Sequence, residues 1–331
     1  MGDDLRMNSL KLAVIGAGAF GRNHVRVLSR LPGVQLIAIV DCDLAKAQQL
    51  ANEHGGQAFA SLADVPAIDA AVVATPTASH EEVATRLLEA GVDVLVEKPI
   101  ADTAAAGERL ARLADEKGRI LQVGHLERFN PAVIALEKAL TVPLFFEIHR
   151  LSIFTPRSLD IDVVLDLMIH DLDLVLSFTQ AVPIEIRAAG ISVLSNKVDI
   201  ANVRLSFASG CIANLTASRV SVEQVRKLRL FQPGEYISLD YHRQDATRFS
   251  VGPAESGPLP KIAFEQLKVE RAEPLESELL AFCDAVRQRS RPRVDAWQGA
   301  RALQLAEAIL DKIKEHAEIV SATIRSRALS K

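Results

Sequence analysis

The stretch Leu10–His24, LKLAVIGAGAFGRNH, decides the fold of this chain. The apolar run Leu12–Ile15 leads directly into the pattern G-x-G-x-x-G, formed by Gly16, Gly18 and Gly21, and a helical pattern follows. In the order strand, glycine turn and helix, this pattern is typical of a dinucleotide site, although a glycine-rich turn can also be purely structural. The first glycine allows a tight turn, the second lets the backbone approach a pyrophosphate, and the third lets the helix pack close to the strand.

Composition describes an ordinary globular protein with more than one domain. The chain has 331 residues, of which 49% are apolar and 24% are charged, and this length favours two domains. Its formal net charge of −4 provides no basic stripe, so we expect no nucleic-acid partner. The cysteines Cys42, Cys211 and Cys283 lie far apart, which supports neither a disulfide framework nor a zinc site and fits a reducing compartment.

The beginning of the sequence, MGDDLRM, is acidic and lacks the apolar segment of a signal peptide. No apolar run approaches the roughly 20 residues that a membrane span requires. We therefore expect a soluble, cytoplasmic protein with no membrane partner.

Short apolar runs alternate with helical patterns in the first third of the chain. The predicted strands are Lys11–Ile15, Gln35–Val40, Ala70–Ala74, Asp93–Val96 and Ile120–Val123. The predicted helices are Arg22–Arg30, Leu44–His54, His80–Ala90 and Thr103–Lys117. This alternation predicts an α/β Rossmann domain over residues 1–126, in which a parallel sheet has helices on both faces.

The pattern changes after about residue 127. A strand is predicted at Leu144–Leu151 and a long helix at Ile161–Phe178. Consecutive strand patterns follow at Glu185–Val193, Ala201–Phe207, Ile212–Ser218, Lys227–Phe231 and Tyr236–Tyr241, then a loop at Val251–Pro260 and helices at Leu275–Arg289 and Trp297–Ala317. Strands without intervening helices indicate an α+β domain with a mainly antiparallel, open sheet over residues 127–331.

The residues of the glycine turn are the first candidates for cofactor contacts: Gly16, Gly18, Ala19, Phe20 and Gly21. Asp41 ends the second predicted strand, where a carboxylate can accept hydrogen bonds from both ribose hydroxyls and would repel a 2′-phosphate. The sequence therefore predicts NAD rather than NADP. The alternative is that Asp41 only caps the next helix.

Two further strand ends carry candidate residues. The turn Thr75-Pro76-Thr77-Ala78-Ser79-His80 follows the run Ala70–Ala74, and Thr75, Pro76 and His80 are placed to line the nicotinamide half of the cofactor. Capping of the next helix is the alternative for this turn. Glu97-Lys98-Pro99 follows the next strand, and a lysine at the mouth of such a crevice can accept a proton. An ordinary surface lysine is the alternative for Lys98.

Asp166 and His170 lie four residues apart in the predicted long helix, which would place both side chains on one face. Asp166 could then orient the imidazole of His170 and stabilise its charged form. A simple surface pair is the alternative. We expect no metal, because the nearby Asp171 and Asp173 would point to other faces of the helix.

Together, the motifs G-A-G-x-x-G, T-P-T-x-x-H, E-K-P and D-x-x-x-H resemble those of the Gfo/Idh/MocA oxidoreductases, which include glucose–fructose oxidoreductase and inositol dehydrogenase. The resemblance covers essentially the whole chain. It implies catalytic roles for Lys98, Asp166 and His170, and contacts of Glu97 and Lys98 with the cofactor. It also implies that the second domain binds the substrate and that its open sheet mediates homodimers or homotetramers.

Three stretches, Val123–Pro131, Thr216–Arg219 and Lys227–Tyr241, resemble the nucleotide-sugar branch of that family. Members of this branch oxidise the 3-hydroxyl of UDP-N-acetylglucosamine or of its uronic acid form. Arg128 and Asn130 are then candidate substrate contacts, because a guanidinium suits a phosphate or a sugar oxygen. An ion pair between the domains is the alternative for Arg128.

The resemblance implies oxidation of a secondary sugar alcohol to a ketone, with hydride transfer to NAD. Lys98 or His170 could remove the hydroxyl proton. We expect Lys98 to be the base, His170 to bind and polarise the same oxygen, and Asp166 to hold His170. Two other functions fit the sequence: a non-catalytic sensor that binds NAD, and a glycoside hydrolase of the same family that recycles its NAD.

Overall fold

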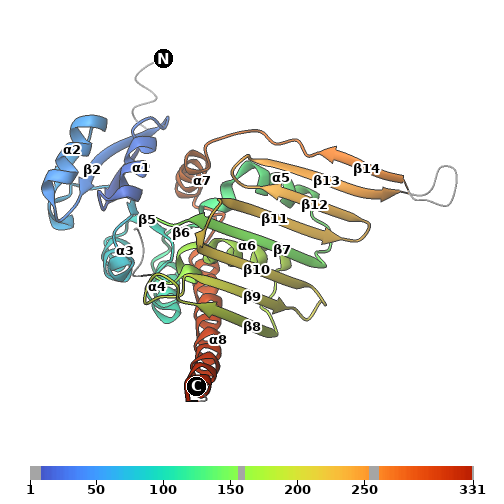
Figure 1. The fold of residues 1–331 in the computed structure, drawn as a ribbon. Helices are drawn as coiled ribbons and strands as arrows, with labels where there is room; N and C mark the ends of the chain where they lie inside the picture. The colour runs from blue at the N-terminus through green and yellow to red at the C-terminus, as the bar shows by residue number, and fades with distance from the viewer. Residues whose placement is uncertain (1–8, 156–160, 253–260, 330–331) are drawn as a thin grey trace. The chain divides into compact units, whose positions relative to one another are not determined.

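The computed structural model describes residues 9–155, 161–252 and 261–329. The chain forms two compact units (Figure 1). Unit 1 comprises Met1–Phe129 and Ala272–Leu303, and unit 2 comprises Asn130–Arg271 and Gln304–Lys331. Among the described residues, no helix combines the length and the apolar character needed to cross a membrane.

Unit 1 contains a six-stranded sheet in the order β3-β2-β1-β4-β5-β6. Its strands are β1 (Leu10–Ile15), β2 (Val34–Val40), β3 (Gln57–Phe59), β4 (Ala70–Val73), β5 (Asp93–Glu97) and β6 (Leu121–Gly124). Every pairing is parallel, which confirms the predicted Rossmann sheet. The strand β3 was not predicted, because three residues are too few to display a hydrophobic pattern.

The predicted helices of unit 1 are present with small shifts at their ends. They are α1 (Ala19–Leu28), α2 (Leu44–His54), α3 (His80–Glu89) and α4 (Ala104–Lys117). The helix α1 packs against α2 and against α7 (Pro274–Gln288), whereas α3 packs against α4. Thr103 caps α4 through a hydrogen bond from the Ala106 N–H group, and Gly118 ends it in the left-handed conformation.

The segment Ala272–Leu303 belongs to unit 1, whereas the sequence pattern predicted that all of residues 127–331 form the second domain. Leu279 and Phe282 of α7 are fully buried in the same core as α1. The Val123 N–H group also donates to the carbonyl oxygen of Val294 at 3.0 Å. The amphipathic pattern of α7 predicts a helix, but it does not specify which core the apolar face will join.

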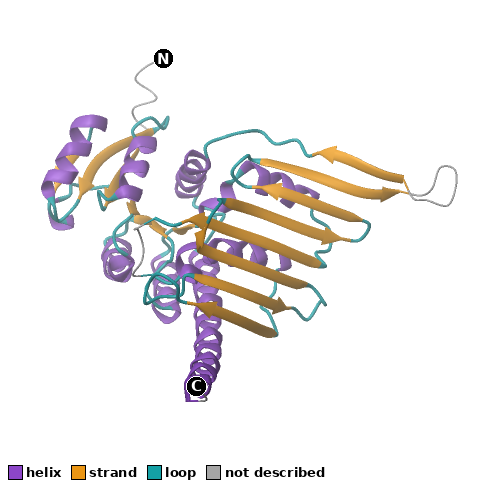
Figure 2. Cartoon of the chain, in the orientation of Figure 1, coloured by secondary structure: helices purple, strands orange, loops and turns teal. Residues whose placement is uncertain are grey.

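Unit 2 contains an eight-stranded sheet in the order β14-β13-β12-β11-β7-β10-β9-β8 (Figure 1). Figure 2 shows the strands of this sheet in orange. Its strands are β7 (Phe145–Ile153), β8 (Glu185–Ile191), β9 (Ile200–Ser206), β10 (Ile212–Ser221), β11 (Val225–Gln232), β12 (Glu235–Asp240), β13 (Asp245–Gly252) and β14 (Lys261–Gln266). All pairings are antiparallel except that of β7 with β10. The structure therefore confirms a mainly antiparallel sheet.

The strands β13 and β14 were not predicted, and a loop was expected at Val251–Pro260. Val251 and Gly252 instead end β13, while residues 253–260 lie outside the described residues. Most side chains of β13 are only half-buried. A half-buried strand need not show the apolar alternation on which the prediction relied, and β14 lies at the edge of the sheet.

The helices of unit 2 are α5 (Pro131–Ala139), α6 (Ile169–Thr179) and most of α8 (Ala296–Leu329). A π-helical turn, Val164–Met168, precedes α6 directly, so the predicted long helix Ile161–Phe178 is not uniform. The Ile169 N–H group donates to the carbonyl oxygen of Val164, five residues back. Hydrophobic periodicity does not distinguish one π-turn from an α-turn over so short a stretch.

The helix α5 was not predicted, although the sequence contains the signal for its amino-terminal end. Asn130 caps the helix and Pro131 stands at its first position, a combination that is typical of a helix start. Inward-facing side chains of the sheet, such as Phe146, Ile148 and Leu228, share one core with Leu172 of α6 and Ile309 of α8. The helices therefore cover one face of the sheet.

Candidate active site

The glycine turn after β1 is built so that only its middle glycine faces open space. Gly16 has φ +103°, and a Cβ atom there would lie 2.5 Å from the carbonyl oxygen of Ala74. A Cβ atom on Gly21 would lie 1.8 Å from the carbonyl oxygen of Gly16. At Gly18, no atom lies within 4 Å of the corresponding position. The first and third glycines are thus required by packing, and the second leaves room for a ligand to approach the backbone.

The amino-terminal end of α1 suits a phosphate group. Its cap residue is Gly18, no side chain caps the helix, and its first turn contains no acidic residue. Ala19 and Phe20 open the helix, and the Phe20 side chain is 59% exposed. The uncapped N–H groups and the helix dipole favour an anion at this position. These residues therefore fit the pyrophosphate of a dinucleotide.

Asp41 contacts the glycine turn rather than capping the next helix. One carboxylate oxygen, Oδ2, accepts the Ala17 N–H group at 2.7 Å, and Oδ1 accepts the Asp43 N–H group at 2.9 Å. The cap of α2 is Asp43, which accepts the Ala45 N–H group at 3.2 Å. A carboxylate at the end of β2 and against the glycine turn suits ribose hydroxyls and disfavours a 2′-phosphate.

The turn after β4 is tied to the E-K-P segment by His80. This side chain is 1% exposed, and its ring nitrogens lie 2.9 Å from the carbonyl oxygen of Thr75 and 2.9 Å from that of Pro99. Burial lowers the pKa of His80, and the contacts with the two carbonyl groups oppose this effect. Ser79 makes no cap for α3; its hydroxyl contacts Thr75 and Pro76 instead. Both nitrogens of His80 therefore have partners within the protein.

Glu97 connects the end of β5 to α1. Its Oε1 lies 2.7 Å from Nε2 of the buried His24, and its Oε2 accepts the Lys98 N–H group at 3.2 Å. Burial acts to raise the pKa of Glu97, but the hydrogen bond and charge of His24 and the charge of Lys98 outweigh it, so this pKa lies below its usual value. The interior carboxyl of Glu278 has a pKa well above its usual range, because it is buried and near the charge of Glu97.

The structure thus brings together the predicted cofactor residues of unit 1. They follow the ends of β1, β2, β4 and β5, which are neighbours in the sheet: Gly16, Gly18, Ala19, Phe20, Gly21, Asp41, Thr75, Pro76, His80, Glu97 and Lys98. Ligands bind at this carboxyl edge in open α/β sheets. The role of His24 was not predicted, because no local sequence pattern indicates a partner 73 residues away.

The predicted catalytic residues Asp166 and His170 belong to unit 2, whereas Lys98 belongs to unit 1. Asp166 lies in the π-helical turn and His170 is the second residue of α6. The prediction that the two residues lie four positions apart on a regular α-helix is therefore wrong. A π-turn is a rare feature that often occurs at functional sites.

The residue after His170 is anchored by a buried ion pair that the sequence analysis missed. Arg150 of β7 donates from Nε and from a terminal nitrogen to the two oxygens of Asp171, each at 2.7 Å. The Tyr241 hydroxyl donates to Asp171 at 3.3 Å, and the Arg150 guanidinium lies 5.0 Å from the centre of the Tyr241 ring. A planar guanidinium that binds both carboxylate oxygens holds the start of α6 in a defined position.

Asn130 and Arg128 flank the division between the units. Asn130 is 4% exposed; its Oδ1 accepts the Ala132 N–H group at 3.1 Å, and its Nδ2 donates to the carbonyl oxygen of Tyr241 at 3.1 Å. These two hydrogen bonds hold the start of α5 in place. Arg128 is 6% exposed, and its carbonyl oxygen accepts a hydrogen bond from Arg293 at 3.0 Å. Both side chains are therefore buried within the protein.

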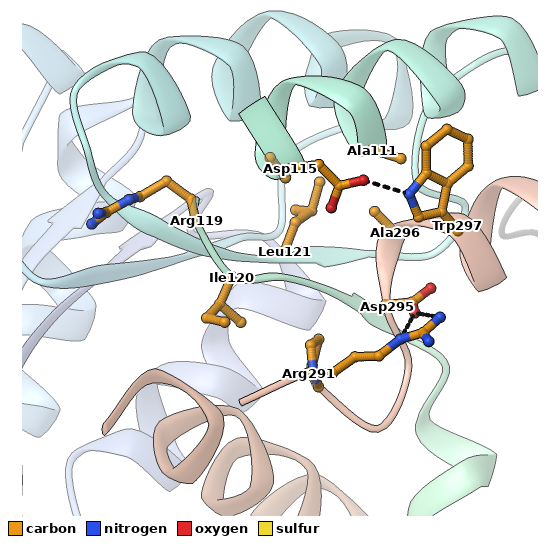
Figure 3. A pocket seen from close by; sticks show the side chains of 11 residues that line it. Ala111, Asp115, Arg119, Ile120, Leu121, Arg291, Asp295, Ala296 and Trp297 are labelled. Carbon is orange, nitrogen blue, oxygen red and sulfur yellow. Dashed lines mark hydrogen bonds and ion pairs between the residues drawn. The ribbon is translucent and has the colours of Figure 1, made fainter. Parts of the chain in front are cut away.

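Unit 1 also has a pocket of about 420 Å³ near the start of β6 (Figure 3). Trp297 donates to Asp115 at 2.8 Å on one side, and Arg291 forms an ion pair with Asp295 on another. Its lining contains none of the predicted site residues among those that the structure describes. The pocket is lined by Ile120 and Leu121, at the amino end of β6. The glycine turn lies at the other edge of the sheet, after the carboxyl end of β1.

Comparison with known protein families agrees with this geometry. Residues 10–125 match the model of an oxidoreductase family with an NAD-binding Rossmann fold. Residues 146–231 match the model of the Gfo/Idh/MocA C-terminal domain. The two matches cover the glycine turn, the E-K-P segment and the region of the π-helical turn.

Individual relatives cover nearly the whole chain. UDP-N-acetylglucosamine 3-dehydrogenase from Acidithiobacillus ferrooxidans is 34% identical over 302 residues, which span 91% of this chain and 96% of that protein. A solved structure of that enzyme has a TM-score of 0.88 at 32% identity and covers 93% of this chain and 98% of its own. Inositol 2-dehydrogenase 1 from Saccharopolyspora erythraea is 27% identical and covers 91% of this chain and 93% of its own.

The cofactor edge, the two matching domain models and these relatives lead to one conclusion. The chain belongs to the Gfo/Idh/MocA family of NAD-binding oxidoreductases, and it is a dehydrogenase.

Proposed function

We propose that this dehydrogenase oxidises a secondary hydroxyl of a nucleotide sugar. The proposed substrate is UDP-N-acetylglucosamine or a close analogue, and the group that is oxidised is its 3-hydroxyl. The observation that carries the proposal is the 34% identity, over 91% of the chain, to an enzyme named for that substrate. The inositol dehydrogenase relative, at 27% identity, supports a free polyol as the second candidate substrate.

Three residues would act on the substrate hydroxyl. Lys98 accepts its proton, His170 binds and polarises the oxygen, and Asp166 holds His170 in place. Bound NAD would supply the hydride acceptor for the carbinol carbon. The contacts of Glu97 support this arrangement. His24 holds one carboxylate oxygen of Glu97, and the other oxygen accepts the Lys98 N–H group, so the backbone that carries the base is held in place.

A single-turnover experiment tests the substrate. Equal amounts of protein and NAD⁺ are mixed with UDP-N-acetylglucosamine, and the absorbance of reduced nicotinamide is followed, with Lys98→Met as the control. We expect a fast rise with the natural protein that the variant lacks. Absence of a rise with this sugar, together with a rise with an inositol or a free sugar, would refute the nucleotide-sugar proposal.

The same experiment separates the two other functions that fit the sequence. NAD binding without reduction by any sugar is the result expected of a sensor. Release of a leaving group without net accumulation of NADH is the result expected of a hydrolase that recycles its cofactor. Either result would contradict the proposed dehydrogenase reaction on these substrates.

We propose that the chain forms a homodimer or homotetramer through the face of the unit 2 sheet opposite its helices. A row of aromatic rings crosses β7, β11, β12, β13 and β14 with centroids 4.8–5.8 Å apart: Phe145, Phe231, Tyr236, Phe249 and Phe264. Phe264 is 69% exposed in the single chain, and exposed apolar patches mark interaction sites. Phe264→Asp should lower the oligomer mass measured by light scattering; an unchanged mass would contradict this interface.

We also propose that the protein is cytoplasmic. Cys42, Cys211 and Cys283 are all free thiols, as expected in a reducing compartment. Burial raises the pKa of both Cys211 and Cys283 to about 11, which keeps these thiols protonated and unreactive.

A further inference from the structure

The π-helical turn Val164–Met168, which contains Asp166, begins at a segment that is held by a residue far along the chain. The Val163 N–H group donates to the carbonyl oxygen of Val198 at 2.9 Å, and the Val198 N–H group donates to Oδ1 of Asp162 at 2.8 Å. The Asp166 N–H group in turn donates to the carbonyl oxygen of Asp162 at 3.0 Å. Val198 therefore holds the two residues from which the π-helical turn begins.

Arg219 of β10 joins this segment to the residue that follows Val198. Its Nη2 donates to the carbonyl oxygens of Ile161 and Val198, the second at 3.3 Å. Its Nε lies 3.6 Å from Oδ1 of Asp199, in an ion pair that we call the entry pair. Arg219 is 6% exposed, and β10 packs against the π-helical turn. The guanidinium group therefore binds both of the segments that meet where the π-helical turn begins.

Asp199 is fully buried and anchors the entry pair. Its Oδ2 accepts the N–H groups of Val193 and Leu194, each at 2.7 Å, and that of Ser195 at 3.0 Å. Its Oδ1 accepts the Ser195 hydroxyl at 2.7 Å. Burial acts to raise the pKa of Asp199, but these hydrogen bonds outweigh it and lower this pKa to about 2. The carboxylate is therefore ionised at neutral pH and faces Arg219 as a fixed charge.

The π-helical turn sets the orientation of Asp166 relative to His170. A π-helical turn contains one residue more than an α-helical turn, and each residue of an α-helix rotates the chain by about 100°. Conversion of the π-helical turn to regular α-helix would therefore rotate the residues on one side of it relative to those on the other. After the turn, the chain is fixed by Arg150, which binds both oxygens of Asp171 at 2.7 Å. Before the turn, the entry pair has the corresponding position.

We propose that Arg219 and Asp199 are positioning residues, which hold the π-helical turn and so keep Asp166 in the orientation from which it holds His170. Neither residue is assigned a contact with the substrate or the cofactor. This inference rests on the proposed function, because it deepens the roles given there to Asp166 and His170. The alternative is a purely structural role, in which the entry pair stabilises unit 2 and has no specific effect on the reaction.

The test uses Arg219→Met, with Gln232→Met as the matched control. Arg219→Met removes the guanidinium group and keeps an unbranched apolar side chain, while Asp199 retains its hydrogen bonds to the N–H groups, so the variant should fold. Gln232 is also buried in unit 2, and its side chain contacts the backbone of Thr141 at 2.8 Å and of Ala139 at 3.0 Å. A third variant, Arg219→Lys, restores a positive charge and a hydrogen-bond donor.

Hydrogen–deuterium exchange, followed by mass spectrometry, tests the hold on the π-helical turn without any substrate. We expect the backbone N–H groups of residues 164–171 to exchange about tenfold faster or more in Arg219→Met, because local opening becomes easier. Gln232→Met should leave this exchange unchanged, and Arg219→Lys should restore part of the protection. Unchanged exchange in Arg219→Met would overturn the proposal.

A double-mutant cycle with Asp166→Asn tests the consequence for the reaction. In the natural background, Arg219→Met should lower kcat for UDP-N-acetylglucosamine by about tenfold or more, because a misplaced group slows the chemical step. The Kd for NAD should not change, since the cofactor residues lie in unit 1. In the Asp166→Asn background, Arg219→Met should lower kcat little further, because residues that act through one contact are not additive. Equal losses of kcat in both backgrounds would show a purely structural role.

The two measurements distinguish failure of this inference from failure of the proposed function. If the natural protein does not oxidise UDP-N-acetylglucosamine, the proposed substrate is wrong; the exchange measurement still applies, and the cycle is run with the sugar or inositol that the protein does oxidise. If Asp166→Asn keeps the kcat of the natural protein on its substrate, the proposed role of Asp166 and this inference are both refuted.

Discussion

Replacing Lys98 by methionine should lower the turnover number by about two to four orders of magnitude, the contribution typical of a general base, while NAD affinity stays nearly unchanged. Methionine keeps an unbranched apolar side chain and removes the ammonium group. The backbone contact survives, because the N–H group of residue 98 is the donor to Glu97, at 3.2 Å. The loss should therefore appear in the chemical step rather than in cofactor binding.

The measurement is steady-state and single-turnover kinetics, with NAD affinity from a fluorescence titration. Lys117→Met is the matched control, since Lys117 is an exposed lysine at the end of α4 in the same unit. It should leave both activity and NAD affinity unchanged. A Lys98→Met protein with the turnover number of the natural enzyme would remove Lys98 from its proposed role, and His170 would become the candidate base.

Alanine at Gly18 and alanine at Gly21 should have opposite consequences, although both belong to one motif. At Gly18 the new methyl group meets no protein atom within 4 Å, so thermal stability should hold. It would occupy the space through which the pyrophosphate approaches, and NAD affinity should fall on the order of tenfold or more. At Gly21 the methyl carbon would lie 1.8 Å from the carbonyl oxygen of Gly16, so the helix α1 must move away from the turn.

For Gly21→Ala we expect the free energy of unfolding to fall by about 2–4 kcal/mol. This loss corresponds to a fall of roughly 5–10 °C in Tm. Differential scanning fluorimetry measures Tm, and calorimetric titration measures NAD affinity; the two variants serve as controls for each other. Unchanged NAD affinity in Gly18→Ala would show that no ligand uses the space beside Gly18. Unchanged stability in Gly21→Ala would contradict the close packing of α1 on the turn.

Local rules account for what could be predicted about the cofactor site. The strand, glycine turn and helix follow one another within Leu10–His24, and each element has a short-range pattern. Asp41 could be placed because the carboxyl ends of parallel strands meet at one edge of a sheet. The predicted position of Asp41 agrees with its contact to Ala17 at 2.7 Å.

Short or exposed elements were harder to predict, since their patterns are weak. β3 has three residues, and β13 is half-buried along most of its length. The region of Asp166 and His170 was predicted as helix, but hydrophobic spacing did not reveal the π-helical turn that contains Asp166. The relative placement of such side chains depends on backbone detail that sequence spacing does not contain.

The sequence by itself determined the fold class, the dinucleotide turn and the residues at the strand ends, because these depend on neighbours within one strand, turn and helix. Only the tertiary structure decided which partners these residues have. It paired His24 with Glu97 across 73 positions and Tyr241 with Asp171 across 70, and it placed Ala272–Leu303 in unit 1. Such contacts arise when distant segments share a core, and an amphipathic pattern specifies a buried face without specifying its partner.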